Sequence, residues 1–227
     1  MCVSKETIDV FRQVRTTDVS DALDSMGMQQ QYEMDIAMRP MWSGLHFAGI
    51  AHTAEYDVID KPLPPMSYEE FEKNQYGGSN PLWREAGPWG APDQVLVIDA
   101  KRTRAGILGS NNTLEGLTRG VVGYVIDGCC RDSYECILEK IPVFCTVRTF
   151  AHPMGRIGPV SSNEPIICAG VRVRPGDVIV GDDDGVIVVP QEEADEVARR
   201  ALLIQAADRP VRRQLYEKLG LPLDHTV

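Results

Sequence analysis

Two short apolar runs in the middle of the chain constrain its fold more than any other feature. Gln94 to Ala100 (QVLVIDA) and Val121 to Ile126 (VVGYVI) are almost free of polar residues between their ends. Strands of this kind are buried on both faces, as in parallel sheets that helices cover. Between them, Gly106 to Gly120 (GILGSNNTLEGLTRG) predicts a glycine-rich turn followed by a helix. This order of elements predicts a mixed α/β fold.

Further strands and two helical ends are expected around this centre. Residues 5–28 carry apolar side chains at the spacing of two short amphipathic helices, with Asp18 or Ser20 as the cap of the second and Gly27 after its end. Strands are predicted within 44–57, 143–149 and 166–190, where Pro175-Gly176-Asp177 and Asp184-Gly185 are turn signals. We expect a single domain over residues 1–227, with N-terminal helices at about 5–28, a core at about 40–190 and C-terminal helices at about 191–220.

Two segments of the predicted domain have unusual composition. Residues 60–92 are rich in Pro and Gly, so we expect an irregular segment with one short helix near 67–74. The helix at 191–207 has acidic residues in its first turn, which the helix dipole favours. Pro210 is expected to break the helical stretch that continues from there to Gly220.

Charge and composition narrow the function classes. The 227 residues carry a formal charge of −10, which disfavours direct contact with a nucleic-acid backbone. No apolar run is long enough to cross a bilayer, and the N-terminus lacks the apolar region of a secretory signal, so we expect no membrane contact and a cytoplasmic location. The six cysteines are then expected to be free thiols.

Gly123 to Asp132 (GYVIDGCCRD) is the most informative stretch for chemistry. A buried strand leads to Asp127, a glycine and then the adjacent Arg131 and Asp132, at the end of the sheet where α/β proteins bind ligands. A guanidinium matches a carboxylate, and an Asp oxygen suits Mg²⁺ or Mn²⁺, so the pair could hold a metal-chelated 2-oxo acid. The alternatives are a local ion pair at a helix start and, for Asp127, a turn-forming role before Gly128.

Two other stretches are candidate binding sites. The turn that includes Gly109, Ser110, Asn111 and Asn112 could cradle an anion with free backbone N–H groups, although such turns often serve only the backbone. The run Asp182-Asp183-Asp184-Gly185 lacks the alternating carboxylates of a calcium loop, so a hairpin turn is the better interpretation.

The stretch GYVIDGCCRD, followed by VRPGDVIVGDDDGVIVVP, resembles the family of class II pyruvate aldolases typified by 4-hydroxy-4-methyl-2-oxoglutarate aldolase, which includes the regulator of ribonuclease E activity A (RraA) proteins. The resemblance spans roughly residues 17 to 220. It implies a swivelling β/β/α-type fold with a C-terminal helix, assembled as a homotrimer or homohexamer with active sites between subunits. It also implies a divalent metal, Mg²⁺ or Mn²⁺.

The resemblance assigns roles to particular residues. Arg131 would hold the pyruvate moiety, Asp132 would ligate the metal, and backbone amides from Gly109 to Asn112 would contact the substrate carboxylate. Asp127 and Asp208 are candidate supporting residues, Asp208 as the C-terminal acid that reaches a neighbouring subunit's site. The chain departs from the family pattern directly after the glycine of the turn, where Ser110 replaces an acidic residue that orders metal-bound water.

The implied reaction is retro-aldol cleavage of a 4-hydroxy-2-oxo acid, in which the metal stabilises the pyruvate enolate. Oxaloacetate decarboxylation passes through the same enolate, so one site could perform both reactions. Two alternatives remain open. One is an RraA-like regulatory protein that binds and inhibits a ribonuclease. The other is an aldolase for a sugar-derived 2-oxo acid, because Ser110, Asn111 and Asn112 offer neutral hydrogen-bonding groups to a polyhydroxylated chain.

Overall fold

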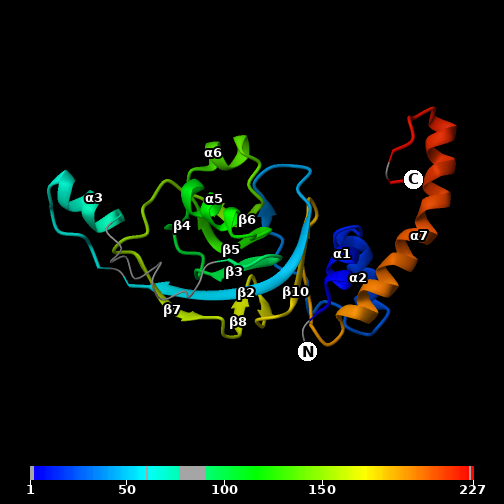
Figure 1. Cartoon of the computed structure of the whole chain (residues 1–227), viewed down its shortest axis with the longest axis horizontal. Coiled ribbons are helices and arrows are strands. Elements are labelled where there is room, and N and C mark those ends of the chain that lie inside the picture. The colour runs from blue at the N-terminus through cyan, green and yellow to red at the C-terminus, as the bar shows by residue number, and fades with distance from the viewer. Residues whose placement is uncertain (1–2, 60, 77–89, 225) are drawn as a thin grey trace.

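A computed structural model describes residues 3–59, 61–76, 90–224 and 226–227 (Figure 1). Within these residues, nine strands form the main sheet and two form a small hairpin. The main sheet contains β1 (Arg39–Pro40), β2 (Phe47–Val58), β3 (Gln94–Asp99), β4 (Gly106–Leu108), β5 (Gly123–Cys130), β6 (Val143–Arg148), β7 (Ile157–Ser162), β10 (Val178–Asp182) and β11 (Gly185–Val189). The hairpin is β8 (Ile166–Cys168) with β9 (Val171–Val173), and the helices are α1 (Lys5–Phe11), α2 (Thr16–Asp24), α3 (Tyr68–Tyr76), α5 (Ser110–Thr118), α6 (Ser133–Leu138) and α7 (Ala194–Leu219).

The centre of the sheet is parallel, as the two apolar runs predict. Strands β2, β3, β5 and β6 pair in parallel, and β4 pairs in parallel with the end of β5. Antiparallel strands β10 and β11 extend one side of this centre, while β1 closes the other. The strands β3 and β5 are buried along nearly all of their length. The mixed α/β fold class is therefore confirmed.

Helices and the small hairpin cover the sheet on different sides. Helices α5 and α6 lie over one face of the parallel strands, and β8 lies on the opposite side (Figure 1). Helices α1, α2 and α7 pack beyond β10 and β11, where Phe11, Leu23, Ile187 and Val197 belong to a separate apolar cluster. The parallel centre is thereby enclosed on both faces, while Arg131 and Asp132, directly after β5, remain partly exposed.

Three boundaries differ from the prediction. Gly106–Leu108 is strand β4 and not a turn, because it pairs with the end of β5. That pairing, with β6 on the other side, carries β5 on to Cys130, so Asp127 lies inside the strand and the turn role expected for it is wrong. At the second helix, Arg15 is the capping residue, and the Asp18 carboxylate accepts a hydrogen bond from Arg15 N at 2.9 Å.

The C-terminal helix is continuous, so the break expected at Pro210 is also wrong. Helix α7 runs from Ala194 to Leu219 with Pro210 inside it. A proline removes one N–H donor from a helix. The carbonyl left without that donor belongs to the exposed residue Ala206, where water can satisfy it. The exposed position makes the proline tolerable.

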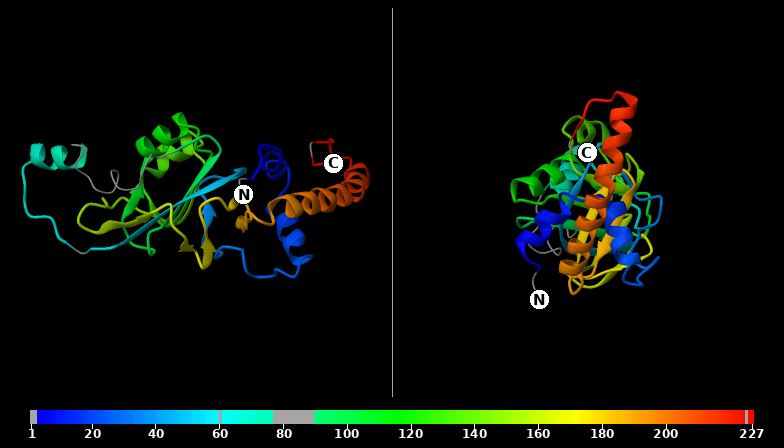
Figure 2. Two further views of the ribbon diagram at one scale, coloured as in Figure 1. Left: turned by 60° about the horizontal axis from the view of Figure 1, so that its bottom comes forward. Right: turned by 90° about the vertical axis from the view of Figure 1, so that its right-hand side faces the viewer.

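Two helices project from the ends of the molecule. Helix α3 stands away from the sheet at one end, and the distal half of α7 extends at the other (Figures 1 and 2). Helix α3 confirms the short helix expected near 67–74. Residues 60 and 77–89 of the segment predicted to be irregular lie outside the described residues.

The remaining turn and cysteine predictions are confirmed where the structure describes them. Gly176 has a φ of +94°, and β10 and β11 form an antiparallel hairpin across Asp184-Gly185. Cys129, Cys130, Cys136, Cys145 and Cys168 are buried free thiols. No helix of the described segments is long and apolar enough to cross a membrane.

Candidate active site

Arg131 and Asp132 directly follow the C-terminal end of β5, which is an inner strand of the sheet. Arg131 N donates a hydrogen bond to Leu108 O at 2.9 Å, which fixes the backbone beside β4. The thiols of Cys130 and Cys136 both lie within hydrogen-bonding reach of the Arg131 carbonyl oxygen, at 3.3 Å and 3.9 Å. Asp132 then adopts a left-handed conformation, with φ of 57°, and α6 begins after it. This corner points the two charged side chains out of the sheet.

The start of α5 lies directly against this corner. Ser110 N donates a hydrogen bond to Asp132 Oδ2 at 3.2 Å. A Cβ on Gly109 would lie 2.2 Å from the same oxygen, and a Cβ on Gly106 would lie 2.8 Å from Arg131 Cβ. Only glycine permits such close approach, because any side chain would displace the charged groups. The structure therefore brings together four of the predicted site residues: Gly109, Ser110, Arg131 and Asp132.

Arg131 and Asp132 are both partly open to solvent. Arg131 Nε lies 3.4 Å from Asp132 Oδ2, and the two side chains are 27% and 33% exposed. Asp132 Oδ1 receives no hydrogen bond from any described residue. One carboxylate oxygen is thus held by the protein, while the other is free for a ligand.

These residues fit a hard divalent cation. Mg²⁺ is usually bound through one or two carboxylates, with waters and substrate oxygens completing its coordination. A single accessible carboxylate such as Asp132 meets that requirement. The described residues contain no cluster of three or more His, Cys, Asp or Glu side chains suited to a metal. A cation here would therefore need substrate and water among its ligands.

Glu135 belongs to this group, although the sequence did not suggest it. The Ser110 hydroxyl donates a hydrogen bond to the Glu135 carboxylate from α6. A second carboxylate therefore lies against Ser110, the residue that stands where the resemblance expects an acidic side chain. Its spacing of three residues from Asp132, at the start of a helix, is the only sequence signal that could have indicated it.

Asn111 and Asn112 lie in the first turn of α5. Asn111 is exposed and Asn112 is half-buried. Neither side chain has a hydrogen-bond partner among the described residues. Their amide groups are thus available to a ligand beside Asp132.

Asp127 and Asp208 are engaged elsewhere. The Asp127 carboxylate accepts hydrogen bonds from Arg102 Nε at 3.0 Å and from Ala169 N at 2.8 Å, so it ties β5 to neighbouring loops. Asp208 pairs with Arg15 at 2.9 Å. Within one chain, neither of them contacts the group around Asp132 in the described structure.

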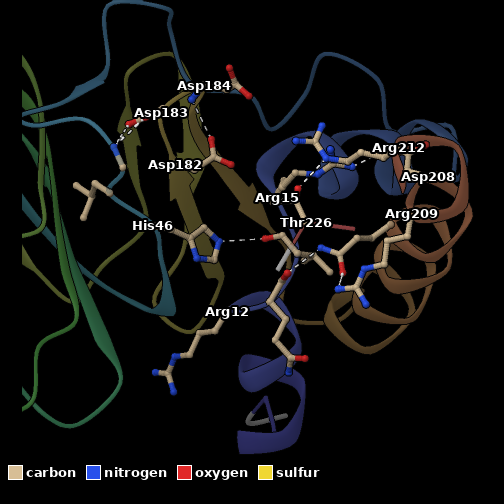
Figure 3. A pocket seen from close by; sticks show the side chains of 15 residues that line it. Arg12, Arg15, His46, Asp182, Asp183, Asp184, Asp208, Arg209, Arg212 and Thr226 are labelled. Carbon is tan, nitrogen blue, oxygen red and sulfur yellow. Dashed lines mark hydrogen bonds and ion pairs between the residues drawn. The ribbon is translucent and has the colours of Figure 1, made fainter. Parts of the chain in front are cut away.

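Asp208 lies on the wall of a separate cavity of about 610 Å³ (Figure 3). This cavity lies between α7, the segment joining α1 to α2, and the β10–β11 turn. Its charged lining residues are Arg12, Arg15, Asp182, Asp183, Asp184, Asp208, Arg209 and Arg212. Since both signs of charge are present in equal number, the cavity has no overall preference for an anion or a cation.

Large apolar side chains flank the Arg131–Asp132 corner. Tyr134 on α6 is 79% exposed, and Phe150, just after β6, is 98% exposed. Two isolated apolar residues on a surface are ordinary, but aromatic residues beside a polar site often mark an interface.

The sheet, with β4, β5 and α5 meeting at the Arg131–Asp132 corner, places the protein in the class of mixed α/β proteins. Comparisons with known proteins identify the group within that class. The RraA-like family, described as Aldolase/RraA, matches residues 16–188. The chain belongs to the RraA-like family.

One relative and two solved structures illustrate the similarity. A Halalkalibacterium halodurans protein named "Putative 4-hydroxy-4-methyl-2-oxoglutarate aldolase" is 32% identical over 218 residues, which cover 93% of this chain and 90% of that protein. An uncharacterized protein from Pseudomonas syringae has a TM-score of 0.76 and 25% identity, covering 100% of this chain and 98% of its own. Streptomyces coelicolor RraAS2, described as an unusual member of the RNase ES inhibitor RraA protein family, has a TM-score of 0.72 at 23% identity, covering 93% of this chain and 99% of its own. These structures support the predicted swivelling β/β/α-type fold.

Proposed function

We propose that this protein is a metal-dependent carbon–carbon lyase that cleaves 4-hydroxy-2-oxo acids to pyruvate and a second carbonyl compound. The observation that carries the proposal is the Arg131–Asp132 corner, where one carboxylate oxygen is held by Ser110 N and the other is free. The similarity to proteins named as 4-hydroxy-4-methyl-2-oxoglutarate aldolases supports the same reaction class.

Each residue of the corner has a role in the proposed reaction. Arg131 binds the carboxylate of the 2-oxo acid with its guanidinium fork. Backbone N–H groups at the start of α5 between Gly109 and Asn112, other than Ser110 N, which donates to Asp132, add hydrogen bonds to that carboxylate. Asp132 holds Mg²⁺ or Mn²⁺ through its free oxygen, and the bound cation supplies Lewis-acid stabilisation of the negative charge that develops on the 2-oxo group. The proton of the 4-hydroxyl leaves to a water or a carboxylate, and Glu135, which accepts a hydrogen bond from the Ser110 hydroxyl, is the carboxylate we assign to this role.

A site of this kind would also decarboxylate oxaloacetate. Loss of CO₂ from oxaloacetate and cleavage of a 4-hydroxy-2-oxo acid both leave an electron pair on C3 of pyruvate. Arg131 would hold the same end of either molecule. We therefore propose oxaloacetate decarboxylation as a second activity of the site.

The substrate could instead come from a sugar acid. The Ser110 hydroxyl donates to Glu135 and so is already occupied as a donor. Only the side chains of Asn111 and Asn112 then remain as neutral partners for a polyhydroxylated chain. If Asn112→Ala leaves the preference between sugar-acid and dicarboxylate substrates unchanged, this alternative loses its support.

We further propose that the protein assembles as a homotrimer or homohexamer, with each site covered by a neighbouring subunit. The exposed aromatic rings of Tyr134 and Phe150 beside the site favour burial against another copy. Such an assembly is also the only way in which Asp208 could come near an Asp132 carboxylate, because the two do not meet within one chain.

Phe150→Asp tests this assembly. We expect the variant to shift toward monomers in size-exclusion chromatography with light scattering and to lose most of its lyase activity, because a charge would be buried in the interface. Val160→Asp, at a residue of β7 that is 58% exposed, is the matched control and should keep the assembly of the wild type. An unchanged assembly of Phe150→Asp would show that this face is not the interface.

The lyase proposal is tested by pyruvate release from a panel of 4-hydroxy-2-oxo acids and oxaloacetate. We expect turnover with Mg²⁺ or Mn²⁺, loss of turnover after chelation with EDTA, and recovery when the metal is restored. Turnover that persists after chelation contradicts the metal role of Asp132. Absence of turnover across the whole panel contradicts the lyase proposal and favours a regulatory protein that acts by binding a ribonuclease.

A further inference from the structure

The segment after β6 runs along the Arg131 side of the site. Thr149 N donates a hydrogen bond to Cys130 O at 3.0 Å, and Gly106 N donates to Ala151 O at 2.9 Å. Gly106 is also the residue against which the Arg131 side chain packs. His152 follows Ala151 directly. Its backbone is therefore one residue from the hydrogen bond between Ala151 O and Gly106 N.

One nitrogen of the His152 ring accepts a hydrogen bond from within the same loop, and the other has no hydrogen-bond partner among the described residues. Met154 N donates a hydrogen bond to His152 Nδ1 at 3.1 Å, so Nδ1 carries no proton in this arrangement. In the neutral ring the proton is then on Nε2, which has no hydrogen-bond partner among the described residues. His152 is therefore a fixed donor whose N–H is not used within the described part of the chain.

The charges around His152 favour this neutral form. Burial lowers the pKa of His152 from its usual 6.5, and the positive charges of Arg131 and Arg156 lower it further. The contacts of Gly106 with Ala151 O and with the Arg131 side chain place the loop that carries His152 next to Arg131. At neutral pH the ring is then an uncharged hydrogen-bond donor beside a cationic, carboxylate-binding side chain.

Helix α3 sets the position of the ring. The Phe71 and His152 rings meet edge to face, with centroids 5.6 Å apart and an interplanar angle of 61°. The chain that leads to α3 is tied to the same loop, because Lys61 N donates to Gly155 O at 2.7 Å and Ile59 N donates to Arg156 O at 3.1 Å. We call residues 59 and 61–76, which end in α3, the α3 arm, and residues 149–156 the histidine loop. The arm is attached to this loop where it leaves β2, through Ile59 and Lys61, and again through Phe71.

We propose that His152 donates a hydrogen bond from Nε2 to an oxygen of the 2-oxo acid held by Arg131, and that Phe71 of α3 positions the ring for this contact. The inference rests on the proposed function, since it assumes a 2-oxo acid at Arg131. It makes α3 part of substrate recognition, a role that no motif in the sequence indicates.

Two variants at position 152 separate substrate binding from loop support. His152→Gln keeps an N–H donor near the position of Nε2 but loses the Nδ1 acceptor for Met154 N. His152→Asn keeps an acceptor near Nδ1 but loses the distal donor. We expect His152→Asn to raise the KM for oxaloacetate and the Kd for oxalate about 10-fold, the cost of one hydrogen bond. His152→Gln should stay within about 3-fold of wild type in both.

The measurements are steady-state kinetics and calorimetric titration of oxalate, a stable analogue of the pyruvate enolate, in the presence of Mg²⁺. A purely structural role for His152 predicts the opposite order, with Asn close to wild type and Gln impaired. Either that order or equal effects would overturn the inference while leaving the lyase proposal intact. A wild-type protein that neither binds oxalate nor releases pyruvate overturns both.

The role of Phe71 is tested by the same two measurements, the KM for oxaloacetate and the Kd for oxalate. Phe71→Ala should raise the KM and the oxalate Kd in the same direction as His152→Asn, and the double variant should be no worse than His152→Asn alone, because both changes remove one contact. Tyr68→Ala is the matched control, since Tyr68 lies on the same helix and is 70% exposed. Fully additive effects of Phe71→Ala and His152→Asn would show that the arm does not act through the ring.

Discussion

Replacing Asp132 with Asn is expected to lower kcat/KM for pyruvate release by about 10²–10³-fold while the protein stays folded. The change removes the charge that would hold the cation but keeps the shape of the side chain. Asn also tolerates the left-handed backbone that Asp132 adopts, with φ of 57°. A coupled assay of pyruvate measures the loss, and circular dichroism measures the fold.

Asp184→Asn is the matched control for this substitution. It removes a carboxylate of the same kind from the β10–β11 turn, away from the corner, and should leave turnover unchanged. Binding of Mn²⁺ in the presence of oxalate gives a second readout and should weaken in Asp132→Asn alone. A variant at position 132 that keeps a third or more of the wild-type activity would contradict the metal-ligand role.

Gly109→Ala is expected to cost about 10²-fold in kcat/KM, although it adds only one methyl group. The new Cβ would lie 2.2 Å from Asp132 Oδ2 and 3.3 Å from Arg131 Cγ, so both charged side chains must move. The backbone of Gly109, with φ of −130°, is one that alanine adopts without strain. The loss should therefore appear in activity more than in thermal stability.

Gly128→Ala provides the comparison. Its Cβ would meet the Ala100 Cβ at 2.7 Å, a clash of similar severity that does not involve Arg131 or Asp132. We expect this variant to melt at a lower temperature yet keep a higher kcat/KM than Gly109→Ala at a temperature where both are folded. Equal losses of activity in the two variants would mean that the effect is general overpacking and not displacement of the Asp132 carboxylate.

The centre of the fold was predictable because its signals are local. The apolar runs at 94–100 and 121–126 became β3 and β5, a turn lies at Pro175-Gly176, and Asp184 lies in the turn that Gly185 closes as the first residue of β11. What the sequence did not indicate depends on pairing between distant segments. The end of β5 is a strand only because β4 and β6 lie on either side of it, so Asp127 could not be placed from its own neighbours.

The same division applies to the site. Arg131 and Asp132 are adjacent, and the glycine turn is a recognisable stretch, so both could be proposed from the sequence. Glu135 and His152 could not. Glu135 joins the group only through the Ser110 hydroxyl, and His152 does so only because the loop after β6 crosses Gly106. His152 carries no spacing pattern, and the three-residue spacing of Glu135 from Asp132 is too common on helices to distinguish it from an ordinary surface residue.

The β5–α6 corner and the α3 arm differ in how firmly they are anchored. The corner follows β5, which lies in the middle of the sheet. The thiols of Cys130 and Cys136 lie within hydrogen-bonding reach of the Arg131 carbonyl oxygen. Helix α3 projects from the molecule (Figure 1), and among the described residues Phe71 contacts the ring of His152. Insertions and replacements within the arm can therefore accumulate at little cost to the folded body. If the proposed roles hold, such an architecture lets a lineage change substrate preference through α3 while the Arg131–Asp132 corner is inherited unaltered.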